Sequence, residues 1–121
     1  MPRVASADVT GAYARSANNG NADSYIIVTQ RGDMILATFN ILKMTQPGLF
    51  GGTQKTNIFS YGIGQLNSAT QTARVTMSSF TEGYCYSILD LQFAGNTLTK
   101  TGVGGTCTPN TSPPESYLLA F

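Results

Sequence analysis

The side chains that could exchange protons near neutral pH are six carboxylates spread along a chain of 121 residues. They are Asp8, Asp23, Asp33, Glu82, Asp90 and Glu115. The sequence contains no histidine and only two cysteines, which excludes a histidine-based catalytic triad and the common zinc and haem sites. We therefore predict no metal site and no cofactor. Any catalysis would have to rest on Asp, Glu or Tyr side chains alone.

Asp90 is the most informative of these carboxylates, because it lies between Leu89 and Leu91 in an apolar segment. In a β-strand it would point away from the row formed by Leu89, Leu91 and Phe93. If that row faces the core, Asp90 belongs to the solvated outer surface. If the row packs outward, Asp90 lines the interior, where burial would raise its pKa and make it the leading acid–base candidate. We favour the solvated position, because carboxylates are rarely buried.

The two cysteines predict one disulfide, Cys85–Cys107, in a small chain that is rich in Thr, Ser, Asn and Gly. The bridge would close a loop of about 20 residues and stabilise the fold by roughly 3 kcal/mol. The alternative is a pair of free buried thiols. A disulfide indicates an oxidising compartment, so we predict a secreted or periplasmic protein. The first residues lack the apolar stretch of a signal peptide, so we expect a mature or trimmed chain.

Clusters of β-branched and aromatic residues, bounded by Gly, Asn or Asp, predict eight β-strands and no helix. The expected strands are residues 9–15, 25–30, 34–43, 57–65, 72–80, 84–93, 97–103 and 116–121. The last segment could instead open a short helix after Pro113 and Pro114, and we favour the strand. Gly62 and Gly64 within one expected strand indicate strong curvature or a close approach of another backbone.

Sequential hairpins of this kind favour a single-domain, antiparallel up-and-down barrel over residues 1–121, with the first and last strands adjacent. A two-sheet β-sandwich is the alternative. Gly11-Ala12-Tyr13 on the first strand resembles the Gly-x-Trp or Gly-x-Tyr motif that opens calycin-like barrels of the lipocalin and avidin type. The hairpin over residues 25–39 also suits that pattern. The resemblance implies a barrel but no ligand, because avidins hold biotin with several tryptophans and this chain has none.

The interior of such a barrel can be filled by side chains or hold one small ligand. The expected inward-facing residues are Phe39, Ile41, Phe59, Tyr61, Ile63, Leu89, Leu91 and Phe93. Leu49 and Phe50 lie between glycines in the longest predicted loop, residues 44–56, so they would either plug one barrel mouth or act as a gate. We predict a ligand site at Phe39, Leu49, Phe50, Phe59 and Tyr61.

Charged residues make up only 11% of the chain, and the net charge is +1, which excludes the basic surface needed for nucleic acid. Arg74, Thr76 and Ser78 interrupt the alternation that a lipid-facing strand needs, so a membrane barrel is disfavoured. The prediction is a ligand-binding barrel that holds a small apolar or aromatic molecule, with a homo-oligomer as a possible assembly. The alternatives are a cofactor-free barrel enzyme of the isomerase or cyclase type and a protein-interaction or inhibitor module.

Overall fold

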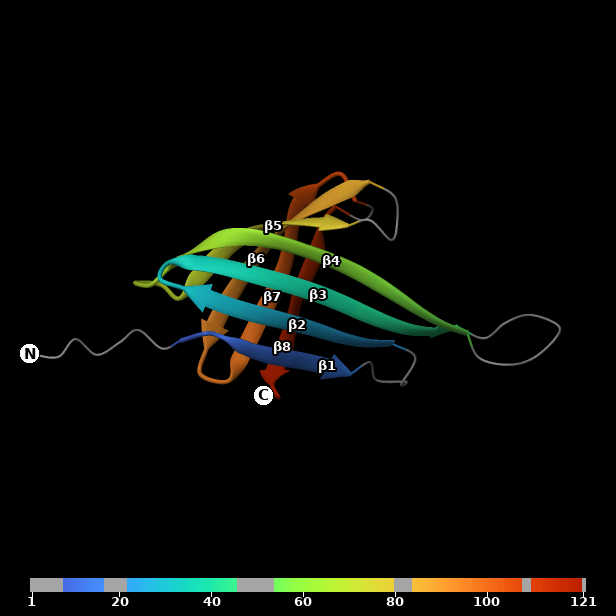
Figure 1. Cartoon of the computed structure of the whole chain (residues 1–121), viewed down its shortest axis with the longest axis horizontal. Coiled ribbons are helices and arrows are strands. Elements are labelled where there is room, and N and C mark those ends of the chain that lie inside the picture. Colours follow the sequence, from blue (N-terminus) through green and yellow to red (C-terminus); the bar gives the residue numbers. More distant parts are fainter. Residues whose placement is uncertain (1–7, 17–21, 46–53, 80–83, 108–109, 121) are drawn as a thin grey trace, which may run out of the picture.

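The computed structural model describes residues 8–16, 22–45, 54–79, 84–107 and 110–120, which contain eight β-strands (Figure 1). The strands are β1 (Gly11–Ser16), β2 (Ala22–Arg31), β3 (Met34–Thr45), β4 (Gln54–Asn67), β5 (Thr72–Ser79), β6 (Cys85–Ala94), β7 (Thr97–Gly105) and β8 (Ser112–Leu119). Each strand pairs antiparallel with the next, and β8 pairs with β1, which closes the sheet into a barrel. The predicted all-β, up-and-down barrel is therefore confirmed, and the sandwich is excluded.

The final segment forms strand β8, so the alternative of a C-terminal helix is wrong. No residue in the described part of the chain is helical. The described residues therefore contain no helix that could cross a membrane. The β2–β3 and β6–β7 hairpins each have a turn of two residues, and glycine is the first of the two. These glycines are Gly32 and Gly95, with φ of +59° and +58°. Glycine reaches this region without steric cost, and a positive φ at the first turn position matches the twist of the flanking strands.

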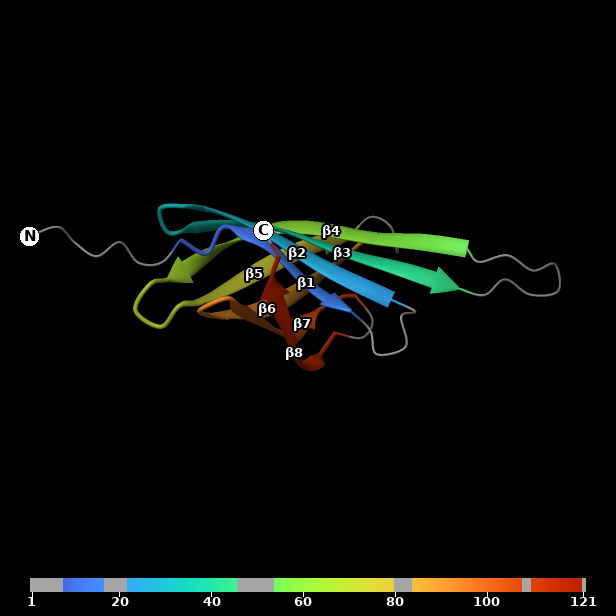
Figure 2. The ribbon, with the colours of Figure 1, turned by 90° about the horizontal axis from the view of Figure 1, so that it is seen from below.

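Strands β3 and β4 are longer than the sequence predicted, and they reach beyond the rest of the barrel (Figure 2). Their ladder continues through Met44↔Lys55 to Thr45↔Gln54. The connection is thus residues 46–53 rather than 44–56. Thr45 and Thr56 are β-branched, and residues of this type favour strands.

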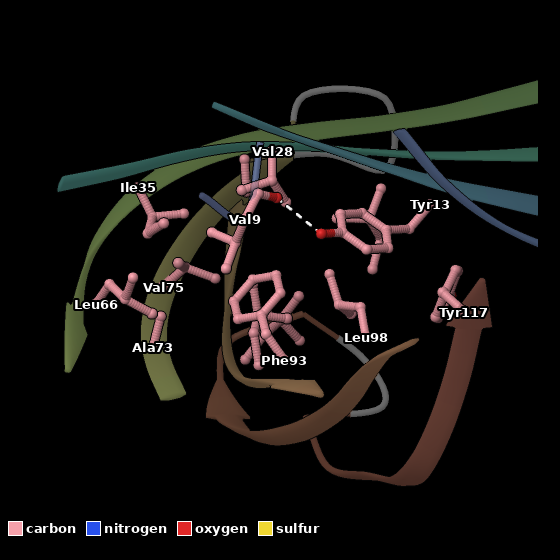
Figure 3. Packing of buried hydrophobic residues seen from close by; sticks show 14 of the residues in the cluster. Val9, Tyr13, Val28, Ile35, Leu66, Ala73, Val75, Phe93, Leu98 and Tyr117 are labelled. Carbon is pink, nitrogen blue, oxygen red and sulfur yellow. Dashed lines mark hydrogen bonds between the residues drawn. The ribbon is translucent and has the colours of Figure 1, made fainter. Parts of the chain in front are cut away.

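A single apolar cluster fills one part of the barrel interior (Figure 3). Its largest fully buried side chains are Ile26, Val28, Ile35, Val75, Met77, Leu91, Leu98 and Tyr117. Leu89 and Phe93 also belong to it, at 7% and 6% exposure, which confirms that the row Leu89, Leu91 and Phe93 faces the core. Tyr13 of the Gly-x-Tyr motif is 3% exposed, and its hydroxyl donates a hydrogen bond of 2.8 Å to the carbonyl oxygen of Val9 (Figure 3).

The inner side of β4 is shaped by a close approach of β5. A Cβ atom added at Gly62 would overlap the carbonyl oxygen of Thr76, and one added at Gly64 would overlap that of Arg74. Only glycine therefore fits at these two places without a shift of the backbone. This confirms the close approach that the two glycines indicated.

The bulky residues of β4 lie on its outer side. Tyr61 and Ile63 are 44% and 51% exposed, whereas Ser60 and Leu66 of the opposite face are buried. The prediction that Phe59, Tyr61 and Ile63 face the lumen is therefore wrong. The physical reason is the lack of room: where β5 closes over β4, the inner face accepts no side chain, so the large residues are placed outside.

Tyr117 makes the stability of the barrel sensitive to alkaline pH. Burial raises the pKa of its hydroxyl to about 12, against the weaker opposing effect of a hydrogen bond with Ser24. The neutral form is thus favoured in the folded state, and this contribution is fully present below the unfolded pKa of 10.0. As the pH rises from about 10 to about 12, the unfolded chain releases this proton first, and about 2–3 kcal/mol of stability is lost.

We expect urea unfolding to show this loss between pH 9.5 and 12, and the Tyr117→Phe variant to lose less stability over the same range. The variant removes the hydroxyl but keeps the ring in the core. Parallel pH dependences for the two proteins would contradict the assignment to Tyr117.

Candidate functional site

A cavity of about 260 Å³ lies inside the barrel, at the end where β5 finishes and β6 begins. Residues from β3 to β8 surround it, so every one of these six strands contributes to its wall. The lining residues are Phe39, Ile41, Ser60, Met77, Ser79, Ser87, Leu89, Lys100, Gly102, Gly104, Cys107, Asn110, Ser112 and Glu115. Within the described residues, the interior is therefore filled at one end by apolar side chains and hollow at the other.

The apolar part of the wall comes from Phe39, Ile41, Met77 and Leu89. The ring of Phe39 packs against the apolar cluster and meets the ring of Tyr117 edge to face, with the centroids 6.4 Å apart. This wall is continuous with the core, so it is held by the same packing that closes the barrel.

Serine hydroxyls supply much of the polar part of the wall. Ser60 and Ser79 are 8% and 6% exposed. The Ser112 hydroxyl accepts a hydrogen bond of 3.1 Å from the backbone N–H of Gly102. The Ser79 hydroxyl is buried, and it has no hydrogen-bond partner among the described residues. Buried polar groups are nearly always paired in folded proteins, so Ser79 marks a place where a polar partner would be stabilising.

Lys100 is a buried cation in the wall of the cavity. It is 6% exposed, and its Nζ atom lies 3.1 Å from Oε1 of Glu115. The other carboxylate oxygen of Glu115, Oε2, lies 2.9 Å from the guanidinium of Arg15. The Lys100 Nζ atom also lies 4.4 Å from the centroid of the Phe39 ring, at a distance typical of a cation–π contact. One carboxylate is thus shared by two cations.

These charges lie beside the weakest seam of the barrel. β1 and β8 share only the register pairs Tyr13↔Leu119 and Ala14↔Leu118. Pro113 and Pro114 occupy the part of β8 that precedes these pairs, and proline lacks the N–H that a ladder needs. The Arg15–Glu115 ion pair bridges the two strands beyond their last backbone pair. Side chains therefore close the seam next to the cavity.

Among the residues predicted to form a ligand site, those that the structure describes do not lie together. Phe39 lines the cavity, whereas Tyr61 is on the outer surface, and its ring lies 5.9 Å from that of Phe59 on the same side of β4. Leu49 and Phe50 lie outside the described residues, so their role as plug or gate stays a prediction.

Sequence reasoning missed Lys100 and Glu115, although the alternation of the strands contained a signal. Lys100 has the same parity as buried Leu98 on β7, and Glu115 has the same parity as buried Tyr117 on β8. In a half-buried strand, residues of one parity face the same side. A lysine and a glutamate on the core-facing side of two strands that pair with each other predict an internal ion pair.

Asp90 lies on the outer face, as the solvated interpretation required. It accepts two hydrogen bonds from Arg74, of 2.7 and 3.0 Å, which together lower the pKa of its carboxyl group. A wider surface depression of about 490 Å³ surrounds this pair and is lined largely by Gln, Asn and Thr. Because the carboxylate is already matched by a cation at the surface, the pair is an exposed structural contact.

The Cys85–Cys107 disulfide is present as predicted. It joins the start of β6 to the segment that follows β7, and Cys107 lines the cavity. The bridge therefore fixes the rim of the hollow end. A disulfide is compatible with an oxidising location such as the periplasm or the extracellular space.

The described residues contain no group of three or more His, Cys, Asp or Glu side chains that could hold a metal ion. Comparison of the chain with protein-family models, with curated proteins and with solved structures found no match. The closed eight-stranded antiparallel barrel is compatible with a calycin-like architecture.

Proposed function

We propose that this chain is a secreted or periplasmic protein that binds a small apolar or aromatic molecule in the hollow end of its barrel. The observation that carries the proposal is the internal cavity of about 260 Å³, which combines a wall of apolar side chains with a few buried polar groups. Small-molecule sites in proteins have this composition, and the mouths of β-barrels are one of their usual places. Asp90, which would be the leading acid–base candidate only in the interior, is paired with Arg74 outside the cavity, which favours binding over catalysis.

The size of the cavity limits the ligand. An apolar cavity of about 150 Å³ is known to hold benzene, whereas sites for drug-sized molecules begin at roughly 300 Å³. A volume of about 260 Å³ therefore suits a single aromatic ring with a short substituent, or an aliphatic chain of similar bulk.

The proposal predicts that phenylacetamide, a neutral one-ring probe, binds the purified protein and shifts the NMR signals of residues around the cavity. Phe39→Ala removes an aromatic wall of the cavity and should weaken this binding about tenfold, which corresponds to about 1.4 kcal/mol. Tyr61→Ala is the matched control, because it removes an aromatic ring from the outer side of the barrel. Absence of binding to the wild-type protein, or equal losses in the two variants, would contradict a lumen site.

A second part of the proposal is self-association through the outer face of β2, β3 and β4. Six apolar side chains on these strands are 40–53% exposed: Tyr25, Ile27, Met34, Leu36, Tyr61 and Ile63. Six half-exposed side chains of this size leave roughly 500 Å² of apolar surface uncovered. This area is in the upper range for the largest apolar patch on a monomeric protein. A second copy presents the same apolar surface, so two copies would form a two-fold dimer whose interface is small and weak.

Sedimentation should therefore show a monomer–dimer equilibrium at micromolar to millimolar concentration. Ile63→Ser should shift it to the monomer, whereas Leu118→Ser, at an exposed position on β8, should not. A wild-type protein that stays monomeric at millimolar concentration would overturn this part of the proposal.

A further inference from the structure

We propose that the ligand of the lumen is a monoanion: a small apolar molecule with one carboxylate group, which is recognised by Lys100 and by the Ser79 hydroxyl. This inference rests on the proposed function, because it names the chemistry of a molecule that would occupy the same cavity. Both groups line that cavity, and both are more than nine-tenths buried.

The first argument is the balance of charge. Lys100 and Arg15 contribute two positive charges, and both pair with the single carboxylate of Glu115. Among the described residues that line the cavity, Lys100 and Glu115 are the only charged ones. The cluster of Arg15, Lys100 and Glu115 therefore carries one net positive charge. The Arg15 side chain is 42% exposed, so its own charge is solvated, but it takes up one oxygen of Glu115 and leaves the buried ammonium of Lys100 with only part of a carboxylate. Because a buried charge is costly unless it is paired, an added negative charge beside Lys100 would be stabilising.

The second argument is the inventory of hydrogen-bond donors. The ammonium group of Lys100 has three N–H donors, and Oε1 of Glu115 occupies one of them. The buried hydroxyl of Ser79 has no partner in the described part of the chain. A carboxylate offers two acceptor oxygens, so it can accept hydrogen bonds from more than one of these donors. Charge-assisted hydrogen bonds of this kind are stronger than those between neutral groups.

The third argument separates a carboxylate from other anions. A phosphate monoester carries about 1.5 to 2 negative charges at pH 7, which is more than the single excess charge of the cluster. The remaining wall, formed by Phe39, Ile41, Met77 and Leu89, is apolar and requires an apolar body next to the charged group. An aromatic or short aliphatic monocarboxylate meets both conditions.

The test uses three probes of one shape and different charge: phenylacetate, phenylacetamide and phenethylamine. Calorimetric titration at pH 7 and low salt should show that phenylacetate binds the wild-type protein at least about tenfold more tightly than phenylacetamide. Phenethylamine should bind more weakly than the amide, because its ammonium group would add to the excess positive charge.

Variants assign the preference to residues. Lys100→Met keeps the length of the side chain and leaves the Arg15–Glu115 pair in place, so it should abolish the preference for phenylacetate while the amide still binds. Ser79→Ala should weaken phenylacetate binding about threefold to tenfold and leave amide binding nearly unchanged. Arg31→Gln removes an exposed cation at the β2–β3 turn and should leave the preference intact.

The outcomes separate the two proposals. If the acid and the amide bind equally, or if the amine binds most tightly, the inference about the carboxylate is overturned while lumen binding stands. If none of the three probes binds, the proposed function fails and the inference fails with it. The comparison of probes on the wild-type protein decides the matter even if Lys100→Met does not fold.

Discussion

Replacing Gly62 with alanine is expected to lower the free energy of unfolding by about 3 kcal/mol, the upper range for overpacking a well-packed site. The added methyl group would overlap the carbonyl oxygen of Thr76 and approach the Cα atom of Met77. These are backbone atoms, so no flexible side chain can move aside, and β5 would have to shift away from β4. The measurement is equilibrium unfolding in urea, with the wild-type protein beside the variant.

Gly104→Ala is the matched control within the same barrel. A Cβ atom at Gly104 would meet only the Cδ1 atom of Ile88, at 3.8 Å, which is an ordinary contact. We therefore expect this variant to change the free energy of unfolding by less than about 1 kcal/mol in either direction. Similar effects at Gly62 and Gly104 would show that the close approach of β5 to β4 does not determine the position of these strands.

Removal of the disulfide in the Cys85→Ser/Cys107→Ser double variant is the second large effect that we expect. The two cysteines are 22 residues apart, and the loss of a loop closure of this length lowers stability by about 3 kcal/mol. The loss of stability is measured by urea unfolding of three samples: the oxidised wild-type protein, the reduced wild-type protein and the variant. The reduced protein and the variant should agree closely, because both lack the same constraint.

The same variant bears on the hollow end of the barrel. Cys107 lines the cavity, so the loss of the bridge should loosen its rim and weaken phenylacetamide binding more than it perturbs the apolar cluster around Val75 and Leu98. A stability equal to that of the oxidised protein would contradict the structural role of the bridge. Protein isolated from its native compartment should show no free thiol by mass spectrometry, and two free thiols would contradict a secreted or periplasmic location.

The placement of charge explains why one end of the barrel is filled and the other is hollow. Leu91 and Leu98 occupy core positions with close apolar neighbours, whereas Lys100 turns a charged group toward the interior. A buried ammonium needs oxygen partners, and Glu115, shared with Arg15, supplies one of them. The serine side chains on the facing strands are too small to fill the space around Lys100. The cavity therefore results from the small polar residues at this end of the barrel.

The sequence by itself determined the eight strands, their order and their hairpins. Gly32 and Gly95 mark the two tight turns, whereas the choice between a strand and a short helix after Pro113 and Pro114 was made only by the structure. It also favoured the disulfide over two free thiols and the inward direction of Leu89, Leu91 and Phe93 over the outward one, and the structure confirmed both. These features depend on local chain conformation and on a period of two, both of which are properties of short segments.

Only the tertiary structure decided which face of β4 is buried and which charged residues enter the interior. Side chains on both faces of a strand repeat with a period of two. The sequence pattern is therefore equally consistent with Phe59, Tyr61 and Ile63 facing the core or facing solvent. The choice depends on β5, whose backbone closes over Gly62 and leaves no room for a side chain on that side. The meeting of Lys100 and Glu115 likewise requires the pairing of β7 with β8, and Arg15 joins them only because the barrel closes through β1. Contacts between distant segments are set by how the whole sheet coils, and no single segment carries that information.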